Sequence, residues 1–382
     1  MIIKNGTVFT PNYRFEGKTI ATQGDRITEV TEGSEVTSSE LYDASGCYVI
    51  PGLTDIHFHG CVGYDFCDGT EEAVKAMASY ELTQGVTTIC PATMTLSEER
   101  LTTICSTAAA YASAQAANPS DTESTLCGIN MEGPFINLSK KGAQNPAYIH
   151  TPDADMFHRL QGLSGGLVKL LAIAPEEPGA LEMIQALKDE VVLSIAHTSA
   201  NYEAAMKGLD AGATHITHLF NAMTPFAHRD AGVVGAAADT INCDVELICD
   251  GIHISPSMVR STFKLFGDQR VILISDSMMA TGMEDGKYAL GGQDVFVKGP
   301  LATLADGTIA GSATNLLNCM RMVVKMGIPL ESAVKAATYN PARSIHILDD
   351  YGTIESGKMA NMVILNKDLT MKNVIFHGKI AY

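Results

Sequence analysis

No Cys-x-x-Cys pair occurs in the sequence, and its nine cysteines are odd in number and scattered along 382 residues. This pattern excludes a disulfide framework and is typical of free thiols in a reducing compartment. No apolar run is long enough to span a bilayer, and Met1–Gly6 does not begin a secretory apolar segment. We therefore expect a soluble, cytoplasmic protein with no membrane partner.

Positive charge is also scarce, because 26 Lys and Arg residues face 43 Asp and Glu residues and the formal net charge is −17. Nucleic acid and anionic membrane surfaces are poor partners for such a chain. An anionic small molecule would need a local cationic site that works against this overall charge. Neither Gly-x-x-x-x-Gly-Lys-Ser/Thr nor Gly-x-Gly-x-x-Gly occurs, so a nucleotide-binding loop is not supported.

Hydrophobic residues make up 46% of the chain and charged residues 18%, which is typical of globular packing, and the length exceeds that of one usual core. The middle of the chain alternates apolar strand-like runs with helix-like stretches. This alternation predicts an α/β fold, a (β/α)8 TIM-type barrel. The eight predicted strands are Leu53–His57, Val86–Cys90, Cys127–Met131, Val168–Ile173, Val191–Ala196, Thr214–His218, Glu246–Cys249 and Val271–Ser275.

Two helices of the predicted barrel can be placed from their ends. The stretch Thr70–Gln84 has acidic residues in its first turn and a glycine after its last turn. Ser97 is the predicted N-cap of a second helix, which runs toward Ala117. The glycine-rich stretch from 221 to 239 shows no helical period, and we expect a long functional loop there.

Both ends of the chain carry short strand patterns. Residues 20–30 alternate around Gly24-Asp25, which predicts a hairpin, and two further strands are predicted at Met362–Leu365 and Val374–His377. We expect these segments to form a small β-sandwich domain beside the barrel. The predicted division is 1–51 for the first part of the small β domain, 52–347 for the barrel and 348–382 for the second part of the small domain.

The most informative motif is His57-Phe58-His59, at the end of the first predicted strand. Successive residues of a strand point to opposite faces, so both imidazoles point the same way. Other polar residues follow later strands, and a barrel brings these positions to one face. They are Glu132 after the third strand, His197 after the fifth, His218 after the sixth, His253 beyond the seventh and Asp276 after the eighth. Each alone is explained as a core histidine or a cap, but six residues at strand ends, with His253 shortly beyond another, favour one shared site.

This set of imidazoles and carboxylates predicts Zn²⁺ or Fe²⁺, and suits Ca²⁺ or Mg²⁺ less well. Such a metal with an open position lowers the pKa of bound water and polarises a carbonyl. Asp276 is the predicted acid and base, which takes the proton of the water and delivers it to a leaving amine. The residues thus predict metal-assisted hydrolysis of an amide-like bond. Position alone leaves open whether Arg229 binds a phosphate or is a solvated surface residue.

A series of motifs in the chain closely resembles those of the N-acetylglucosamine-6-phosphate deacetylase family, within the amidohydrolase superfamily. The matching segments are Pro51–Gly60, Met131–Phe135, Lys141–Ala143, Ala174–Glu176, Ala196–Thr198, His218–Met223, His228–Arg229, Asp250–His253, Ser275–Asp276, Ile309–Ser312 and Asn340–Arg343. The resemblance covers nearly the whole chain in family order. It implies removal of acetate from N-acetyl-D-glucosamine 6-phosphate by a metal-dependent hydrolase, in a homodimer whose phosphate contacts can cross the subunit boundary.

The resemblance also implies roles for individual residues. Glu132, His197 and His218 would hold the principal metal, His57 and His59 would allow a second one, and Asp276 would be the acid and base. The substrate-binding residues that the resemblance implies are Ala143, Gln144, Asn221, Ala222, Arg229, Asp250, Gly251, Ile252, His253, Ile309, Ala310 and Gly311.

Gln144 departs from the family, which often has histidine at this position. A glutamine can hydrogen bond to a sugar hydroxyl or an acetamido group but carries no positive charge. The N-acetylgalactosamine 6-phosphate epimer is therefore an alternative substrate. A cyclic amidase or deaminase that uses a carboxylated lysine is a further alternative, although Lys169 lies near the wrong end of the fourth strand. A catalytically inactive barrel that serves as a binding module is the last.

Overall fold

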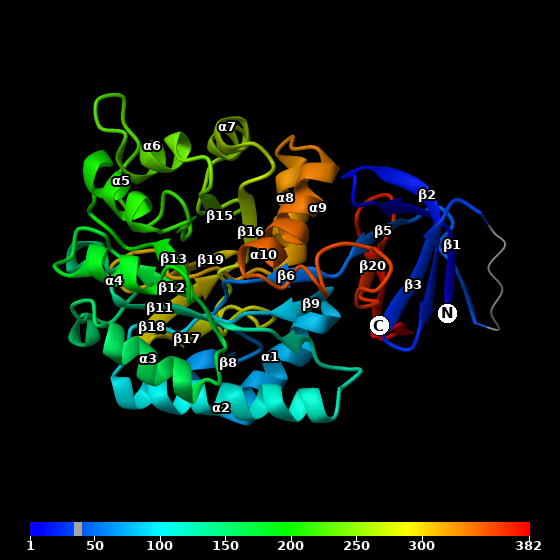
Figure 1. The fold of residues 1–382 in the computed structure, drawn as a ribbon, viewed down its shortest axis with the longest axis horizontal. Coiled ribbons are helices and arrows are strands. Elements are labelled where there is room, and N and C mark those ends of the chain that lie inside the picture. Colours follow the sequence, from blue (N-terminus) through cyan, green and yellow to red (C-terminus); the bar gives the residue numbers. More distant parts are fainter. Residues whose placement is uncertain (34–39) are drawn as a thin grey trace.

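The computed structural model describes residues 1–33 and 40–382, which form a barrel beside a small β domain (Figure 1). The barrel strands pair in parallel in the orders β10-β9-β6 and β11-β12-β13-β14-β15-β16. A bridge between Ala92 and Asn130 joins the two groups, and the Asp276 N–H donates to the His57 carbonyl at 2.9 Å on the opposite side. The predicted barrel is confirmed. Its strands are β6 (Leu53–Asp55), β9 (Val86–Ile89), β12 (Val168–Ile173), β13 (Val192–Ile195), β14 (His215–Ile216), β15 (Asp244–Ile248), β16 (Val271–Ile274) and, as two successive pieces of the third strand, β10 (Thr125–Leu126) and β11 (Ile129–Phe135).

Helices cover the outside of the barrel (Figure 1). The predicted N-cap at Ser97 is confirmed, because its side chain accepts from the Arg100 N–H. The Thr70 side chain caps α1 in the same way and accepts from the Ala73 N–H. The helices are α1 (Glu71–Thr83), α2 (Glu98–Ala117), α3 (Ala154–Leu163), α4 (Ala180–Leu187), α5 (Tyr202–Ala211), α6 (Gly232–Asp239), α7 (Pro256–Phe266), α8 (Leu316–Lys325), α9 (Leu330–Ala337) and α10 (Tyr339–Ser344).

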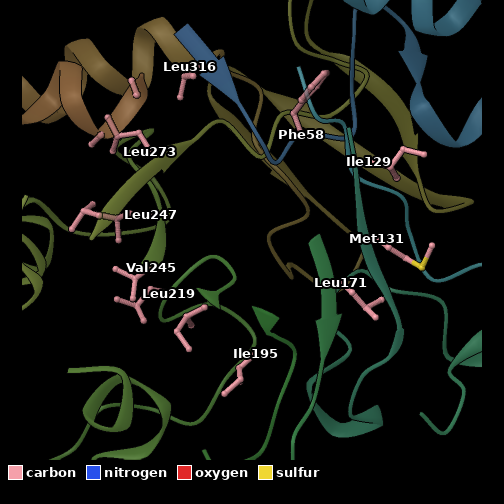
Figure 2. Close-up of a cluster of buried hydrophobic side chains, with 14 of the residues drawn as sticks. Phe58, Ile129, Met131, Leu171, Ile195, Leu219, Val245, Leu247, Leu273 and Leu316 are labelled. Atoms are coloured by element: carbon pink, nitrogen blue, oxygen red, sulfur yellow. The ribbon is translucent and has the colours of Figure 1, made fainter. Parts of the chain in front are cut away.

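Alternate residues of the barrel strands build two apolar layers. Leu247 and Leu273 belong to the layer between strands and helices (Figure 2), whereas Ile272 and Ile274 belong to a separate cluster inside the barrel. Period-2 alternation explains this division, because neighbouring side chains of a strand point to opposite faces. The filled interior leaves the chemistry to the carboxyl ends of the strands.

Two predictions about element ends are wrong. Residues 232–239 of the predicted loop form α6, and six of its eight residues are buried. A helix buried on most sides has no polar face, so no helical period was visible there. The predicted end of the third strand at Met131 is also wrong, because β11 continues to Phe135 with a shift in register. Glu132 therefore lies within the strand and not after it.

Strands from both ends of the chain form one eight-stranded sheet, in the order β22-β21-β20-β5-β1-β2-β3 with β4 paired to β1. The predicted hairpin is confirmed, with Gln23 paired to Arg26 around its turn. Buried residues from β1, β2, β3, β5, β20 and β21 form one core between parts of this sheet. Its strands are β1 (Ile2–Phe9), β2 (Phe15–Gln23), β3 (Arg26–Thr31), β4 (Leu41–Asp43), β5 (Tyr48–Pro51), β20 (Met362–Leu365), β21 (Met371–Phe376) and β22 (Lys379–Ile380). The domain boundaries at 51/52 and 347/348 remain predictions.

Short elements complete the mouth of the barrel. They are β7 (Gly60–Cys61), β8 (Tyr64–Asp65), β17 (Gly286–Leu290), β18 (Gln293–Lys298), β19 (Leu301–Thr303) and the 3-10 helices η1 (Phe66–Asp68), η2 (Leu138–Lys140) and η3 (Pro146–Tyr148). Within residues 1–33 and 40–382, no helix combines the length and apolar character that a membrane crossing requires.

Candidate active site at the mouth of the barrel

A cavity of about 300 Å³ opens at the carboxyl ends of the barrel strands. Five of the six predicted metal-site and catalytic residues line it, and the sixth, His57, is completely buried beside them. The five residues that line the cavity are His59, Glu132, His197, His218 and Asp276. Residues up to 219 positions apart therefore meet, as the barrel geometry predicts.

Glu132, His197 and His218 form the first group of converging ligand atoms. The Nε2 atoms of both histidines lie 3.0 Å from Glu132 Oε1 and 3.1 Å from each other. Ligands about 2.0 Å from a tetrahedral ion are about 3.3 Å apart, so these three atoms fit around one ion. His197 Nδ1 lies 2.8 Å from the Lys140 carbonyl, which fixes the proton on Nδ1 and leaves Nε2 free to bind a metal.

His57, His59 and Asp276 form the second group. His59 Nε2 lies 3.3 Å from both Asp276 Oδ1 and Glu132 Oε2, so Glu132 stands between the two groups. The Nε2 of His57 is buried without a hydrogen-bond partner among the described residues. A buried nitrogen left without a partner costs free energy unless a ligand occupies the site. The donor set of this group therefore also fits a divalent metal.

Glu246 supports both groups from the interior of the barrel. Its Oε2 lies 2.8 Å from His57 Nδ1 and accepts from the His218 N–H at 3.1 Å, while Oε1 lies 3.0 Å from His215 Nε2. His215 Nδ1 in turn contacts the Ser344 hydroxyl at 2.9 Å. Burial alone would raise the pKa of Glu246, but the charge of His57 and these hydrogen bonds hold it below its ordinary value. The carboxylate thus fixes the ring orientation of His57.

Three of the converging residues have left-handed backbone angles. The φ angles are 43° at His197, 30° at His218 and 48° at Asp276. Such conformations cost about 1–3 kcal/mol each for residues other than glycine and concentrate at functional sites. They turn the chain sharply at the strand ends and aim the side chains into the cavity.

The two carboxylates of the cavity floor are held in their charged form. Burial would raise the pKa of Glu132, but the charge of His57 and hydrogen bonds from His197 and His218 hold it well below its ordinary value. Burial likewise opposes charge on Asp276, and hydrogen bonding to His59 lowers its pKa. An ionised Asp276 is able to accept a proton.

Most of the residues that the resemblance assigns to the substrate are at the cavity. Ala143, Gln144, Asn221, Ala222, His253, Ile309 and Gly311 line it. Ala310 is buried behind the lining, and Asp250 lies beneath His253, with its Oδ2 2.7 Å from His253 Nδ1. Burial would lower the pKa of His253, but this contact raises it, which favours a cationic ring. Gly251 and Ile252 are exposed beside it and do not line the cavity.

Arg229 is not brought to the cavity. It is exposed and borders a separate hollow with residues such as Asn201 and Tyr202. The stretch 226–230 is exposed throughout, at the point where the predicted loop leads into α6. Within one chain, Arg229 therefore has no contact with the converging ligands.

Several cavity residues were not predicted from the sequence. Lys140 lines the cavity, and its Nζ donates to the Met223 carbonyl at 3.3 Å, next to Ala222. Met94, Leu290 and Thr308 form further parts of the wall. The Lys140-Lys141 pair before a glycine is visible in the sequence, but no pattern indicates which of the two lysines lines the cavity.

The sequence profile described as "Amidohydrolase family" matches residues 48–381, which is most of the chain. The chain belongs to this family. Amidohydrolases depend on metals, and the two ligand groups give this member positions that could hold one. The match covers the barrel and the C-terminal strands of the small β domain.

Relatives with known activities cover nearly the whole chain. N-acetylglucosamine-6-phosphate deacetylase of Bacillus subtilis is 33% identical over 386 residues, which is 100% of this chain and 97% of the relative. N-acetylgalactosamine-6-phosphate deacetylase of Escherichia coli O157:H7 is 31% identical over 333 residues, 87% of each chain. A variant of N-acetyl-D-glucosamine-6-phosphate deacetylase from Mycobacterium smegmatis, solved in complex with N-acetyl-D-glucosamine-6-phosphate, has a TM-score of 0.90 and 32% identity over 100% of this chain and 99% of the other.

Proposed function

We propose that this amidohydrolase removes acetate from N-acetyl-D-glucosamine 6-phosphate and leaves D-glucosamine 6-phosphate. The observation that carries the proposal is that Glu132, His197, His218 and Asp276 converge on one cavity floor. The relatives named N-acetylglucosamine-6-phosphate deacetylase support the substrate. The cavity of about 300 Å³ is at the lower limit of ordinary small-molecule sites.

Glu132, His197 and His218 would hold the principal divalent metal, Zn²⁺ or Fe²⁺, and His57 and His59 would hold a second one. A bound metal would polarise the acetamido carbonyl and make an attacking water more acidic. For the second group, the buried His57 Nε2 without a hydrogen-bond partner among the described residues supports this assignment. One or two metals per subunit are compatible with the geometry.

Asp276 would move the proton in this reaction. It takes a proton from water as the water oxygen adds to the acetyl carbon. The same proton then passes to the sugar nitrogen as the carbon–nitrogen bond breaks, so that acetate and the amine leave and the carboxylate is restored. The buried and ionised state of Asp276 supports this role.

The sugar phosphate would extend from the ligand groups toward the cavity rim. Lys140 and His253 would bind the phosphate, because the Lys140 ammonium group is at the cavity and the pKa of His253 is raised. Asn221 and Ala222 lie on the same rim, and Asp250, Gly251 and Ile252 form the segment that carries His253. Ala143, Ile309, Ala310 and Gly311 would border the sugar.

Arg229 would reach the phosphate only from a second subunit, since it does not line the cavity of its own chain. We therefore also propose a homodimer in the cytoplasm. Light scattering with size-exclusion chromatography tests the oligomeric state. Replacement of Arg229 by Ala should raise KM for the phosphorylated sugar, and a monomer with an unchanged KM removes Arg229 from the site.

The three alternatives are not equally well supported. The galacto epimer remains open, because one relative is an N-acetylgalactosamine-6-phosphate deacetylase. A cyclic amidase or deaminase with a carboxylated lysine is less well supported, because Lys169 is the second residue of β12 and thus far from its carboxyl end. A catalytically inactive barrel is disfavoured by the complete set of ligand side chains.

Acetate release from N-acetylglucosamine 6-phosphate and from its galacto epimer, measured in parallel with metal-reconstituted enzyme, tests the proposal. A strong gluco preference supports it, and a galacto preference transfers the assignment to the second activity. If neither epimer releases acetate, the proposed substrate is wrong, and the assignment to the amidohydrolase family is unchanged.

A further inference from the structure

The side chain of Gln144 is almost completely enclosed, although it stands at the wall of the cavity. Only 1% of the residue is exposed. Its Oε1 accepts from the Thr95 N–H at 2.6 Å, and its Nε2 donates to Glu132 Oε2 at 2.6 Å. The second N–H faces Met94 Sδ at 3.6 Å. The protein itself therefore holds both ends of the amide.

The chemistry of these partners fixes the orientation of the amide. A backbone N–H only donates, and an ionised carboxylate only accepts. Turning the Gln144 amide around would place its NH₂ against the Thr95 N–H and its oxygen against the Glu132 carboxylate. Both contacts would be repulsive at 2.6 Å, so one orientation is strongly favoured.

The acceptor end of Gln144 rests on a rigid part of the barrel mouth. A Cβ at Gly133, directly after Glu132, would lie 2.1 Å from Thr95 Oγ1. The Thr93 N–H also donates to the Asn130 carbonyl at 2.9 Å. The segment with Thr95 and strand β11 are thus packed closely together, and Gln144 links them through side-chain hydrogen bonds.

The hydrogen bonds of Gln144 determine the orientation of the Glu132 carboxylate. Gln144 holds Oε2, while Oε1 lies 3.0 Å from the Nε2 atoms of His197 and His218. Rotation of the carboxylate would break a hydrogen bond to a charged acceptor in a buried site, which is unfavourable. We propose that Gln144 is a positioning residue that orients Glu132 for metal binding and is not a contact of the sugar. This inference deepens the proposed function and rests on it for the metal.

The test measures the affinity of metal-stripped enzyme for Zn²⁺, by competition with a chromogenic chelator and without substrate. Gln144→Met keeps the length of the side chain and removes its donor, so Zn²⁺ should bind about 10–100-fold more weakly. At saturating Zn²⁺, KM for the sugar phosphate should change by less than about threefold, because no sugar contact is lost. Gln293→Met is the matched control, since Gln293 donates to the Ala143 carbonyl on the same loop without touching Glu132. Its Zn²⁺ affinity should equal that of the wild type.

An unchanged Zn²⁺ affinity in Gln144→Met overturns the proposal, and a raised KM in that case assigns Gln144 to the sugar. Gln144→Asn provides a second variant if the first fails to fold. Its amide is one methylene too short to link Thr95 and Glu132, so the same loss of Zn²⁺ affinity is expected, and wild-type affinity there also overturns the proposal. The Zn²⁺ affinity is measured without substrate, so it still tests the role of Gln144 if the proposed deacetylation is wrong.

Discussion

Glu246 Oε2 lies 2.8 Å from His57 Nδ1, and both residues are completely buried inside the barrel. The contact fixes the proton of the imidazole on Nδ1 and turns Nε2 toward Glu132 and Asp276. Carboxylates that hold metal-binding histidines in this way orient the ring and make it a stronger ligand. His57 therefore depends on Glu246 for its role in the site.

Replacement of Glu246 by Gln should lower the affinity for the metal near His57 by about 10–100-fold. The amide cannot accept at both positions from His57 and His215, so the His57 ring loses its fixed orientation. Metal content after dialysis against defined free Zn²⁺ measures the effect. Ser344→Ala is the control, because Ser344 contacts only the far side of His215 and its loss should leave the content unchanged. Equal metal contents in Glu246→Gln and the wild type contradict the prediction.

Replacement of Asp276 by Asn should lower kcat by about 10²–10⁴-fold, because general acid–base catalysis contributes about this much and an amide cannot take the proton. The metal of the first group should be retained, since Glu132, His197 and His218 form a complete group without Asp276. Steady-state acetate release and elemental analysis of the same preparation check both statements. Retained turnover would remove Asp276 from proton transfer, and a parallel loss of metal would assign it to binding instead.

The sequence predicted which side chains converge because these residues follow a simple geometric rule. His57, His59, His197, His218 and Asp276 occur near strand ends, and the barrel brings strand ends together. Glu132 was identified although its strand extends further than predicted, because the end of a strand is less certain than its presence. The sharp turns at His197, His218 and Asp276 depend on left-handed backbone angles, which no local sequence pattern indicates.

Other parts of the site could not be predicted, for different physical reasons. Glu246 is a single acid within an apolar strand, and its partners are His57, just after β6, and His215 of β14. Gln144 carried the visible signal of a departure from the family, but its two buried partners are set by tertiary packing. The proposed contact of Arg229 with a second subunit cannot be seen in the structure of a single chain.

Replacement of Lys140 by Met should raise KM for the phosphorylated sugar by about 10–100-fold, because a hydrogen bond between charged groups contributes about 1.5–3 kcal/mol. Of the cavity-lining residues in the described part of the chain, Lys140 alone is a Lys or Arg. Lys141→Met is the control, since Lys141 Nζ contacts the Gly142 carbonyl and Lys141 does not line the cavity. KM from acetate release distinguishes the two variants. Equal effects of both substitutions would attribute the change to overall charge.

Glu81 should make the stability of the protein depend on pH. It is completely buried in α1, and neither carboxylate oxygen has a hydrogen-bond partner among the described residues. Burial, with a smaller contribution from Asp55, raises the pKa of Glu81 well above its ordinary value. The folded state then keeps a proton that the unfolded state releases above its ordinary pKa of 4.5. The free energy of unfolding therefore falls as pH rises from that value, by at most about 1.4 kcal/mol per pH unit for this group.

Glu81→Gln should reduce this pH dependence, because glutamine does not titrate. The variant should gain stability relative to the wild type as pH rises from about 5.5 to 8, as measured by the free energy of unfolding in denaturant titrations. Glu71→Gln provides the control, because Glu71 is exposed on the same helix and its replacement should leave the slope unchanged. Identical slopes for Glu81→Gln and the wild type would mean that Glu81 is ionised in the folded protein. The Cys61 thiol, a weak donor that lowers the pKa of Glu81, would then have to compensate for the burial of this carboxylate.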